Sequence, residues 1–204
     1  MTRLTDLRRP DAGITLISRW GTGTPERTRA AADALLEQWS AADAPAILLA
    51  THVFTDVDGS GLLIHGQWTS AEEHQAFVRD GRAARVGRID ARVPGIERSG
   101  LSRTHPYRGV VLDADADGEA GVFAVACHET DGAPGGARAW ADARVDALRD
   151  GPPPGLLAAH LHLDVDGKRV VEISEWADGA EGETPARPAG LPLTRYRFYG
   201  SAGR

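Results

Sequence analysis

Apolar and polar positions along the chain switch between the two-residue period of a strand and the 3.6-residue period of a helix. Thr24 is a good N-cap, Pro25 fits a first helical turn, and apolar side chains then recur at helical spacing as far as Trp39. Ser70 is a second N-cap, and Gly81 interrupts the helix that follows it. The expected elements are a strand at 13–20, a helix at 25–39, strands at 46–55 and 61–69, a helix at 71–92 and a strand at 101–112.

The two central strands are predicted to form a hairpin. The Asp-Gly pair at 58–59 is the pair that a two-residue type I′ turn prefers. With that turn, His52 faces His65 and Leu49 faces Trp68. One face of the hairpin is apolar and is expected to lie under the helices, so Trp68 is predicted to point between sheet and helices.

The same sequence pattern occurs twice in the chain. Residues 52–68 read HVFTDVDGSGLLIHGQW and residues 160–176 read HLHLDVDGKRVVEISEW. His, Asp, Val, Asp, Gly and Trp recur at one constant spacing, the repeat offset, which carries His52 to His160 and Trp68 to Trp176. A repeat of about a hundred residues is a duplicated domain, because solenoid units are much shorter. A duplicated domain brings its own two-fold partner, so the architecture of a homodimer can lie within one chain.

Each repeat has the order strand, helix, strand, strand, helix, strand, which is that of the ferredoxin-like fold. After Trp176 the second repeat is about sixteen residues shorter, and residues 179–190 hold two prolines and three glycines. We therefore expect an α+β fold of two ferredoxin-like repeats, the second without most of its second helix. The first repeat is then the one expected to hold the ligand pocket. The expected domains are an N-terminal domain at 1–112, a linker at 113–120 and a degenerate C-terminal domain at 121–204.

Composition narrows the class of partner. The net charge is −6 and no basic run is interleaved with aromatics, which argues against nucleic acid. No apolar stretch approaches the ~18 residues that span a bilayer, and the first residues lack the apolar core of a signal peptide. We therefore expect a cytoplasmic protein with no membrane partner. Cys127 is the only cysteine, which excludes an internal disulfide framework and a CxxC metal site.

Five segments resemble the antibiotic biosynthesis monooxygenase family, which contains cofactor-free anthrone oxygenases of aromatic polyketide pathways. They are ISRW at 17–20, GTPE at 23–26, QWTSAEE at 67–73, IDARVPG at 89–95 and Tyr-Arg at 107–108. The resemblance implies a dimeric α+β barrel of two ferredoxin-like sheets face to face, here formed by the two halves of one chain. It also implies a pocket between sheet and helices for a flat aromatic polyketide, an anthrone or polyphenol that O2 oxidises to a quinone.

The resemblance implies three catalytic residues. Trp68 matches the strand-end Trp of the family and is expected as an aromatic wall and N–H donor. His74 stands where the family can use a Tyr and is the expected base, since imidazole titrates near neutral pH. Arg88 matches an Arg of family members and would stabilise a substrate enolate. The Asn that the best understood enzymes carry four residues before the Trp is Ile64 here. The expected substrate contacts are Thr51, Ile64 and Phe77.

Each of these residues also has a purely structural interpretation. Trp68 can pack in the core, His74 can be exposed on a polar helical turn, and Arg88 can belong to the solvated face of an arginine-rich helix. Four histidines can form a hydrogen-bonded core, an acid–base group or a metal site, with His52 and His65 as secondary candidates for catalysis. The group comprises His52, His65, His160 and His162. No metal-ligand spacing supports a metal, and none is expected.

Two further functions stay open. Some relatives cleave a ring with reduced flavin, and the same pocket can hold a polyketide without catalysis, as in a cyclase-like accessory protein. No Gly-rich phosphate loop follows a strand, so no tightly bound flavin or nicotinamide is expected, and reduced flavin would be a co-substrate. The chain is expected to be a monomer or a homodimer.

Overall fold

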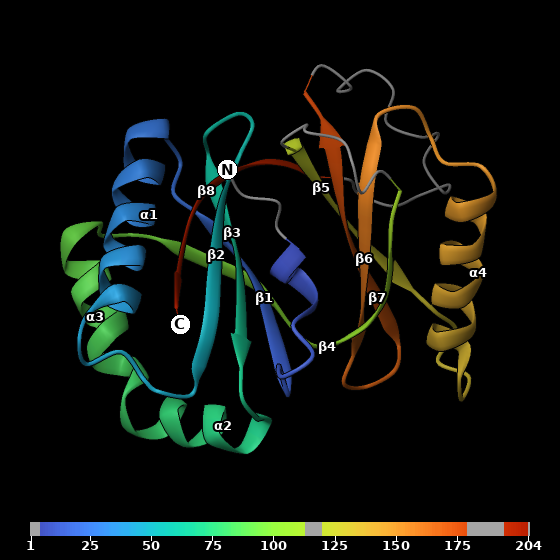
Figure 1. Cartoon of the computed structure of the whole chain (residues 1–204). Helices are drawn as coiled ribbons and strands as arrows, with labels where there is room; N and C mark the ends of the chain where they lie inside the picture. Colours follow the sequence, from blue (N-terminus) through green and yellow to red (C-terminus); the bar gives the residue numbers. More distant parts are fainter. Residues whose placement is uncertain (1–4, 113–119, 179–193, 204) are drawn as a thin grey trace. The chain divides into compact units, whose positions relative to one another are not determined.

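The computed structural model describes residues 5–112, 120–178 and 194–203 (Figure 1). It divides into two compact units. The N-terminal unit comprises residues 10–103 and 197–204, and the C-terminal unit comprises residues 1–9 and 104–196. These limits differ from those of the expected domains, because strands β4 (Glu97–Val111) and β8 (Thr194–Gly203) each continue from one unit into the other. The expected linker lies outside the described residues except for its last residue, Ala120, which begins a strand.

The helices of the N-terminal unit begin at the predicted caps. The Thr24 hydroxyl accepts a hydrogen bond from the N–H of Arg27 at the start of α1 (Pro25–Ser40). The Ser70 hydroxyl likewise accepts the N–H of Glu73 at the start of α2 (Ala71–Asp80). Helix α3 (Arg82–Arg92) begins directly after Gly81, so the predicted interruption is confirmed.

The sheet of the N-terminal unit is antiparallel. Its strands are β1 (Ile14–Gly21), β2 (Leu48–Asp56), β3 (Gly61–Trp68), the first part of β4 and the last part of β8. β3 lies between β1 and β2 and pairs with both, as the ferredoxin-like order requires. The α+β class is therefore confirmed. Helices α1 and α3 cover one face of this sheet (Figure 1), where Leu35, Val53, Leu62, Ile64 and Ile89 form a buried core.

The hairpin register follows the prediction except at one end. His52 faces His65, as expected. Trp68 faces Leu48, so the prediction that it faces Leu49 was wrong. The cause is a β-bulge between Leu48 and Ala50, which inserts one extra residue into β2.

The turn of this hairpin also differs from the prediction. A type I′ turn needs positive φ at both central residues, but no non-glycine residue in the described part of the chain has positive φ. Gly59, with φ of 75°, donates its N–H to the carbonyl of Asp56 at 3.1 Å. The loop therefore runs over the four residues 57–60 between the strands. It keeps the register because it is centred on the same point of the chain.

The C-terminal unit is a second antiparallel sheet with one helix on it. Its elements are a 3₁₀ helix η1 (Thr5–Arg8), β5 (Ala120–Glu129), α4 (Gly136–Asp150), β6 (Leu156–Asp164), β7 (Arg169–Ala177) and the parts of β4 and β8 assigned to this unit. β7 pairs with β5 and β6, β5 also pairs with residues 194–196 of β8, and β6 pairs with β4. The first residues of β6 and β7 follow those of β2 and β3 at the repeat offset. The segment predicted to lack a second helix, residues 179–190, lies outside the described residues.

Each unit buries the apolar side of its helices. In the C-terminal unit Ala141, Val145 and Leu148 of α4 pack on Leu161 and Trp176 of the sheet. Full burial of one such aliphatic side chain contributes about 1.5–3 kcal/mol. Among the described residues no helix is long and apolar enough to cross a bilayer.

Candidate active site

A cavity of about 430 Å³ lies in the N-terminal unit, bounded by strands β1 to β4 and helices α1 to α3. This volume is within the usual range for a small-molecule site. Five of the eight candidate residues line it: Thr51, Ile64, Trp68, His74 and Phe77. The prediction that the apolar hairpin face lies under the helices is thereby confirmed. The roles assigned to these residues stay predictions.

Aromatic rings form one wall of the cavity. The Trp68 ring lies 5.2 Å from Phe77 and 5.8 Å from Trp39, measured between centroids, with the Trp39 contact edge to face. Such a cluster is rigid and apolar, so it suits a flat aromatic ligand. Trp39 was not selected from the sequence as a site residue. Its place on the apolar stripe of α1 predicts burial, but does not distinguish a core residue from a cavity wall.

His74 belongs to this wall and is not exposed. Its side chain is buried, and its ring centroid lies 4.7 Å from that of Trp68 in an edge-to-face contact. The interpretation of His74 as an exposed turn residue was therefore wrong, because α2 turns this side of its first turn toward the sheet. Burial, followed by the charges of Arg103 and Arg82, lowers the pKa of His74 from 6.5 to about 4. The imidazole is neutral at pH 7 and can accept a proton.

Five arginines line the cavity: Arg19, Arg82, Arg85, Arg98 and Arg103. Two of them are held in place. Arg85 donates to the carbonyl of Gln38 at 2.7 Å and pairs with Asp43, and Arg98 pairs with Asp90 at 2.6 Å.

Arg82 and Arg103 differ from these two. Within the described part of the chain no ion pair involves Arg82 or Arg103. Both cations lower the pKa of His74, so both act electrostatically on the same site. A negatively charged ligand in the cavity would meet two positive charges, although their exposure to solvent weakens each of them.

Arg88 does not line the cavity. Its guanidinium is exposed and donates from Nε to Oε1 of Gln38 at 2.5 Å. The arginine nearest to the expected role is Arg82, six residues earlier on the same helix. Sequence spacing alone does not choose between them, since both lie in one arginine-rich run.

His52 and His65 are buried away from the cavity. Their ring centroids are 5.7 Å apart, as the register requires. In the C-terminal unit Nε2 of His160 lies 2.6 Å from Oε1 of Glu175, and burial lowers the pKa of His162 to about 3. In residues 5–112, 120–178 and 194–203, no group of three or more His, Cys, Asp or Glu side chains is arranged to hold a metal ion.

The corresponding positions of the C-terminal unit, found with the repeat offset, are filled differently. Glu172, the counterpart of Ile64, accepts two hydrogen bonds from Arg144, at 2.8 and 2.9 Å. The Trp176 indole N–H donates to the hydroxyl of Ser174 at 2.9 Å. A partly buried ion pair and a hydrogen-bonded tryptophan thus occupy the positions where the N-terminal unit has an apolar wall and an open cavity.

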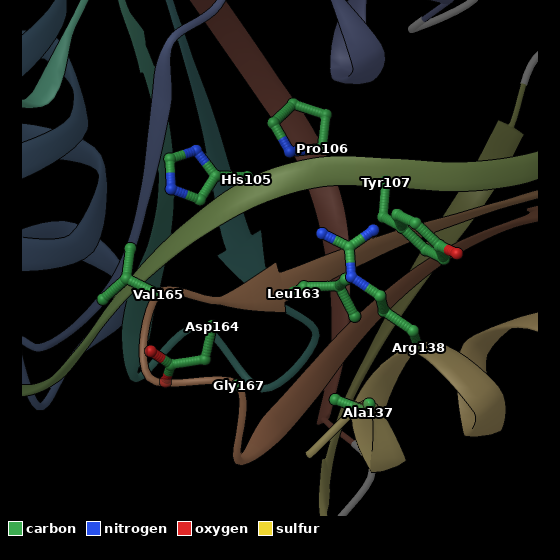
Figure 2. A pocket seen from close by; sticks show the side chains of 10 residues that line it. His105, Pro106, Tyr107, Ala137, Arg138, Leu163, Asp164, Val165 and Gly167 are labelled. Carbon is green, nitrogen blue, oxygen red and sulfur yellow. The ribbon is translucent and has the colours of Figure 1, made fainter.

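The C-terminal unit has its own cavity of about 410 Å³, at a different place. It lies between β4, the turn after β6 and the start of α4 (Figure 2). The guanidinium of Arg138 lies over the ring of Tyr107, and Asp164 is neutralised by Arg169 at 2.8 Å. His105 also lines this cavity, but none of the eight candidate residues does.

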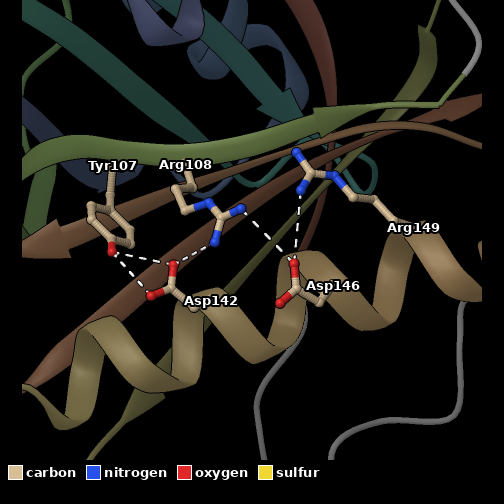
Figure 3. Close-up of polar contacts among 5 residues, drawn as sticks. All are labelled: Tyr107, Arg108, Asp142, Asp146 and Arg149. Atoms are coloured by element: carbon tan, nitrogen blue, oxygen red, sulfur yellow. Dashed lines mark hydrogen bonds and ion pairs between the residues drawn. The ribbon is translucent and has the colours of Figure 1, made fainter.

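Tyr107 and Arg108, which carried part of the family resemblance, have a structural role. The Tyr107 hydroxyl donates to Asp142 at 3.2 Å, and Arg108 pairs with Asp142 at 2.7 Å (Figure 3). Arg108 also reaches Asp146 at 3.9 Å, which pairs with Arg149. These contacts fasten β4 to α4, and they hold the pKa of Asp142 below its usual value, chiefly through the Arg108 hydrogen bond.

Solved structures with this fold are known. The chain is similar to an anthrone oxidase-like protein, with 17% sequence identity and a TM-score of 0.65 over 94% of this chain and 93% of that one. It is also similar to presumed monooxygenases from Fusobacterium nucleatum subsp. nucleatum and Lactobacillus acidophilus. These have TM-scores of 0.58 and 0.54, both at 10% identity, and cover 95% and 94% of this chain and 95% and 96% of theirs. No protein-family model matches the chain, and no curated protein matches it. Such low identity shows a shared fold alone, because one fold can carry unrelated activities.

Proposed function

We propose that this protein is a monooxygenase that oxidises an aromatic polyketide, an anthrone or a related polyphenol, to the quinone with O2. The observation that carries the proposal is the contact of His74 with Trp68 inside an aromatic-walled cavity. A neutral base and an aromatic surface are what a flat phenol needs in order to be bound and deprotonated. The fold shared with an anthrone oxidase-like protein supports the same reaction class.

The reaction balances without a further reductant. The His74 imidazole takes one proton from the methylene carbon of the anthrone, leaving an enolate. This electron-rich anion passes an electron to O2, and recombination forms a carbon–peroxide bond. The peroxide takes up a proton and loses water, so that the CH2 group and O2 become a carbonyl group and water.

The remaining residues stabilise the enolate. The Trp68 indole N–H is a donor for the enolate oxygen, and Arg82 and Arg103 place positive charge near it. These charges take the place of the amide that the family resemblance leads one to expect at Ile64. Thr51, Ile64 and Phe77 contact the ring system, and the aromatic wall covers one side of it. No tightly bound cofactor is included in this proposal.

The domain duplication belongs to the same proposal. Two observations support it. The first and last residues of β6 follow those of β2 by the repeat offset, and the bulge found in β2 recurs in β6 between Leu156 and Ala158. The intramolecular barrel, the cytoplasmic location and the choice between monomer and homodimer stay predictions.

Oxygen uptake with 1,8-dihydroxyanthrone tests the proposal, measured against spontaneous oxidation and against the His74→Phe variant. Uptake by the wild type that exceeds both, without added flavin, is the expected result. Uptake only with reduced flavin would favour the ring-cleaving alternative. Tight binding of the quinone with no uptake under either condition would identify a non-catalytic polyketide-binding protein, the function that the apolar Ile64 favours.

A further inference from the structure

The two units provide an internal comparison at one tryptophan. In the C-terminal unit the hydroxyl of Ser174 accepts the indole N–H of Trp176 at 2.9 Å and donates to the carbonyl of Ala124 at 3.2 Å. All three residues are buried. The indole N–H of Trp176 therefore has its hydrogen-bond acceptor within the protein and is not available to a ligand.

Gly66 occupies the place in the N-terminal unit that corresponds to Ser174 under the repeat offset. A Cβ built on Gly66 would lie 3.2 Å from Nε1 of Trp68 and 4.0 Å from the carbonyl oxygen of Leu16. These are the counterparts of the two atoms that Ser174 joins. Gly66 has no side chain to join them, and both Gly66 and Trp68 line the cavity. Among the described residues no hydrogen bond is formed by the Trp68 indole.

We infer that Gly66 is a specificity-determining residue, which keeps the Trp68 indole N–H available to an acceptor oxygen of the ligand. The ligand class, an aromatic ketone or quinone, rests on the proposed function. A serine at position 66 would place a hydroxyl beside the Trp68 indole. That hydroxyl would accept the hydrogen bond of the indole N–H, so the ligand would lose this donor. The backbone allows the change, since Gly66 does not have positive φ. The 3.2 Å contact requires the indole to shift by a few tenths of an ångström, in Gly66→Ser and in Gly66→Ala alike.

The first test needs no ligand. In protein labelled with ¹⁵N, the indole resonances of Trp68 and Trp176 are assigned with Trp68→Phe and Trp176→Phe. The Trp68 indole proton is expected to exchange with solvent faster than that of Trp176. Gly66→Ser should move it downfield and slow its exchange, whereas Gly66→Ala, which adds only the methyl group, should not move it downfield. Ser174→Gly should have the reverse effect on Trp176. Equal exchange of the two indoles in the wild type, or an unchanged Trp68 signal in Gly66→Ser, would overturn the inference.

The second test uses 1,8-dihydroxyanthraquinone, which binds without turnover. Gly66→Ser should raise its Kd about two- to tenfold above that of Gly66→Ala, the effect of one lost hydrogen bond. Equal losses in both variants would show that Gly66 provides space only, and would overturn the inference. Binding to the wild type without oxygen uptake from the anthrone would instead overturn the proposed function alone. No binding to the wild type would overturn both.

Discussion

The rings of His74 and Trp68 are in T-shaped contact, with 4.7 Å between the two centroids. The contact joins the first turn of α2 to the end of β3, so a change in either residue acts on the other. It places a neutral nitrogen base beside one of the three tryptophans that line the cavity.

Replacing His74 by phenylalanine should abolish most of the turnover. The phenyl ring keeps the edge contact with Trp68 but has no nitrogen to accept a proton, and losing one positioned proton-transfer group costs about 10²–10⁴-fold in rate. The measurement is kcat for anthrone oxidation, with thermal unfolding as the control for folding. Because His74 is buried, His74→Ala is the poorer variant: it would leave a void and lower stability as well. Wild-type kcat in a folded His74→Phe protein would contradict the assignment of the base.

The pH dependence of kcat/KM should show the low pKa of His74. The base works only when it is neutral, and a pKa of about 4 keeps it neutral down to that pH, whereas an ordinary histidine is half protonated at 6.5. Activity should therefore stay level as the pH falls from 7 to about 5 and be half lost near 4. A loss centred on pH 6.5 would show that His74 is not buried in the working enzyme, or is not the base.

Removing one of the cations should change both binding and titration. Arg103→Met takes away a positive charge that lowers the pKa of His74, so that pKa should rise toward 6.5 in an NMR titration. The same variant should bind an anionic hydroxyanthraquinone more weakly, by roughly two- to fivefold for a partly exposed charge. Arg88→Met is the matched control, since Arg88 is exposed and bonded to Gln38 outside the cavity. An equal effect of the two variants would mean that net charge, rather than position, matters.

Trp68 and Trp176 provide a paired test of the indole donor. Trp68→Phe keeps an aromatic wall but removes the N–H, and should weaken quinone binding with little change in stability. Trp176→Phe removes an N–H that is bonded to Ser174, and should cost about 1 kcal/mol of unfolding free energy with no change in ligand affinity. Ligand titration measures the Kd of each variant, and chemical denaturation measures its free energy of unfolding. Weaker ligand binding in Trp176→Phe would show that the assignment to the N-terminal unit is wrong.

Removing one partner of the Arg144–Glu172 ion pair should destabilise the C-terminal unit more than replacing both partners together. Arg144→Leu leaves a largely buried carboxylate without its partner, which costs about 3 kcal/mol of unfolding free energy. Arg144→Leu combined with Glu172→Ile, the residue types at 36 and 64 in the first repeat, should recover most of that loss. Denaturant unfolding of the two single variants and the double variant measures the coupling. Additive losses would mean that the two side chains contribute independently.

The sequence by itself determined the elements and much of the sheet. Capping residues and the apolar period act within a few residues of the chain, so Thr24 and Ser70 predicted the starts of α1 and α2 without any tertiary contact. The hairpin register, with His52 opposite His65, was predicted correctly because the four-residue loop is centred on the same point as the predicted two-residue turn. The resemblance then selected Trp68 and His74, whose side chains line one cavity.

Only the tertiary structure decided what surrounds those residues. His74 follows two glutamates on a polar turn, and its burial depends on how far α2 is rotated against the sheet, which local pattern does not encode. The choice between Arg88 and the cavity residues Arg82 and Arg103 depends on the same packing. The role inferred for Gly66 depends on how closely its backbone approaches the indole nitrogen of Trp68. The physical reason is the same for all of these properties: they depend on distances between segments that are far apart in sequence. The residue pattern of one helix or strand determines only the directions in which its side chains point from that element.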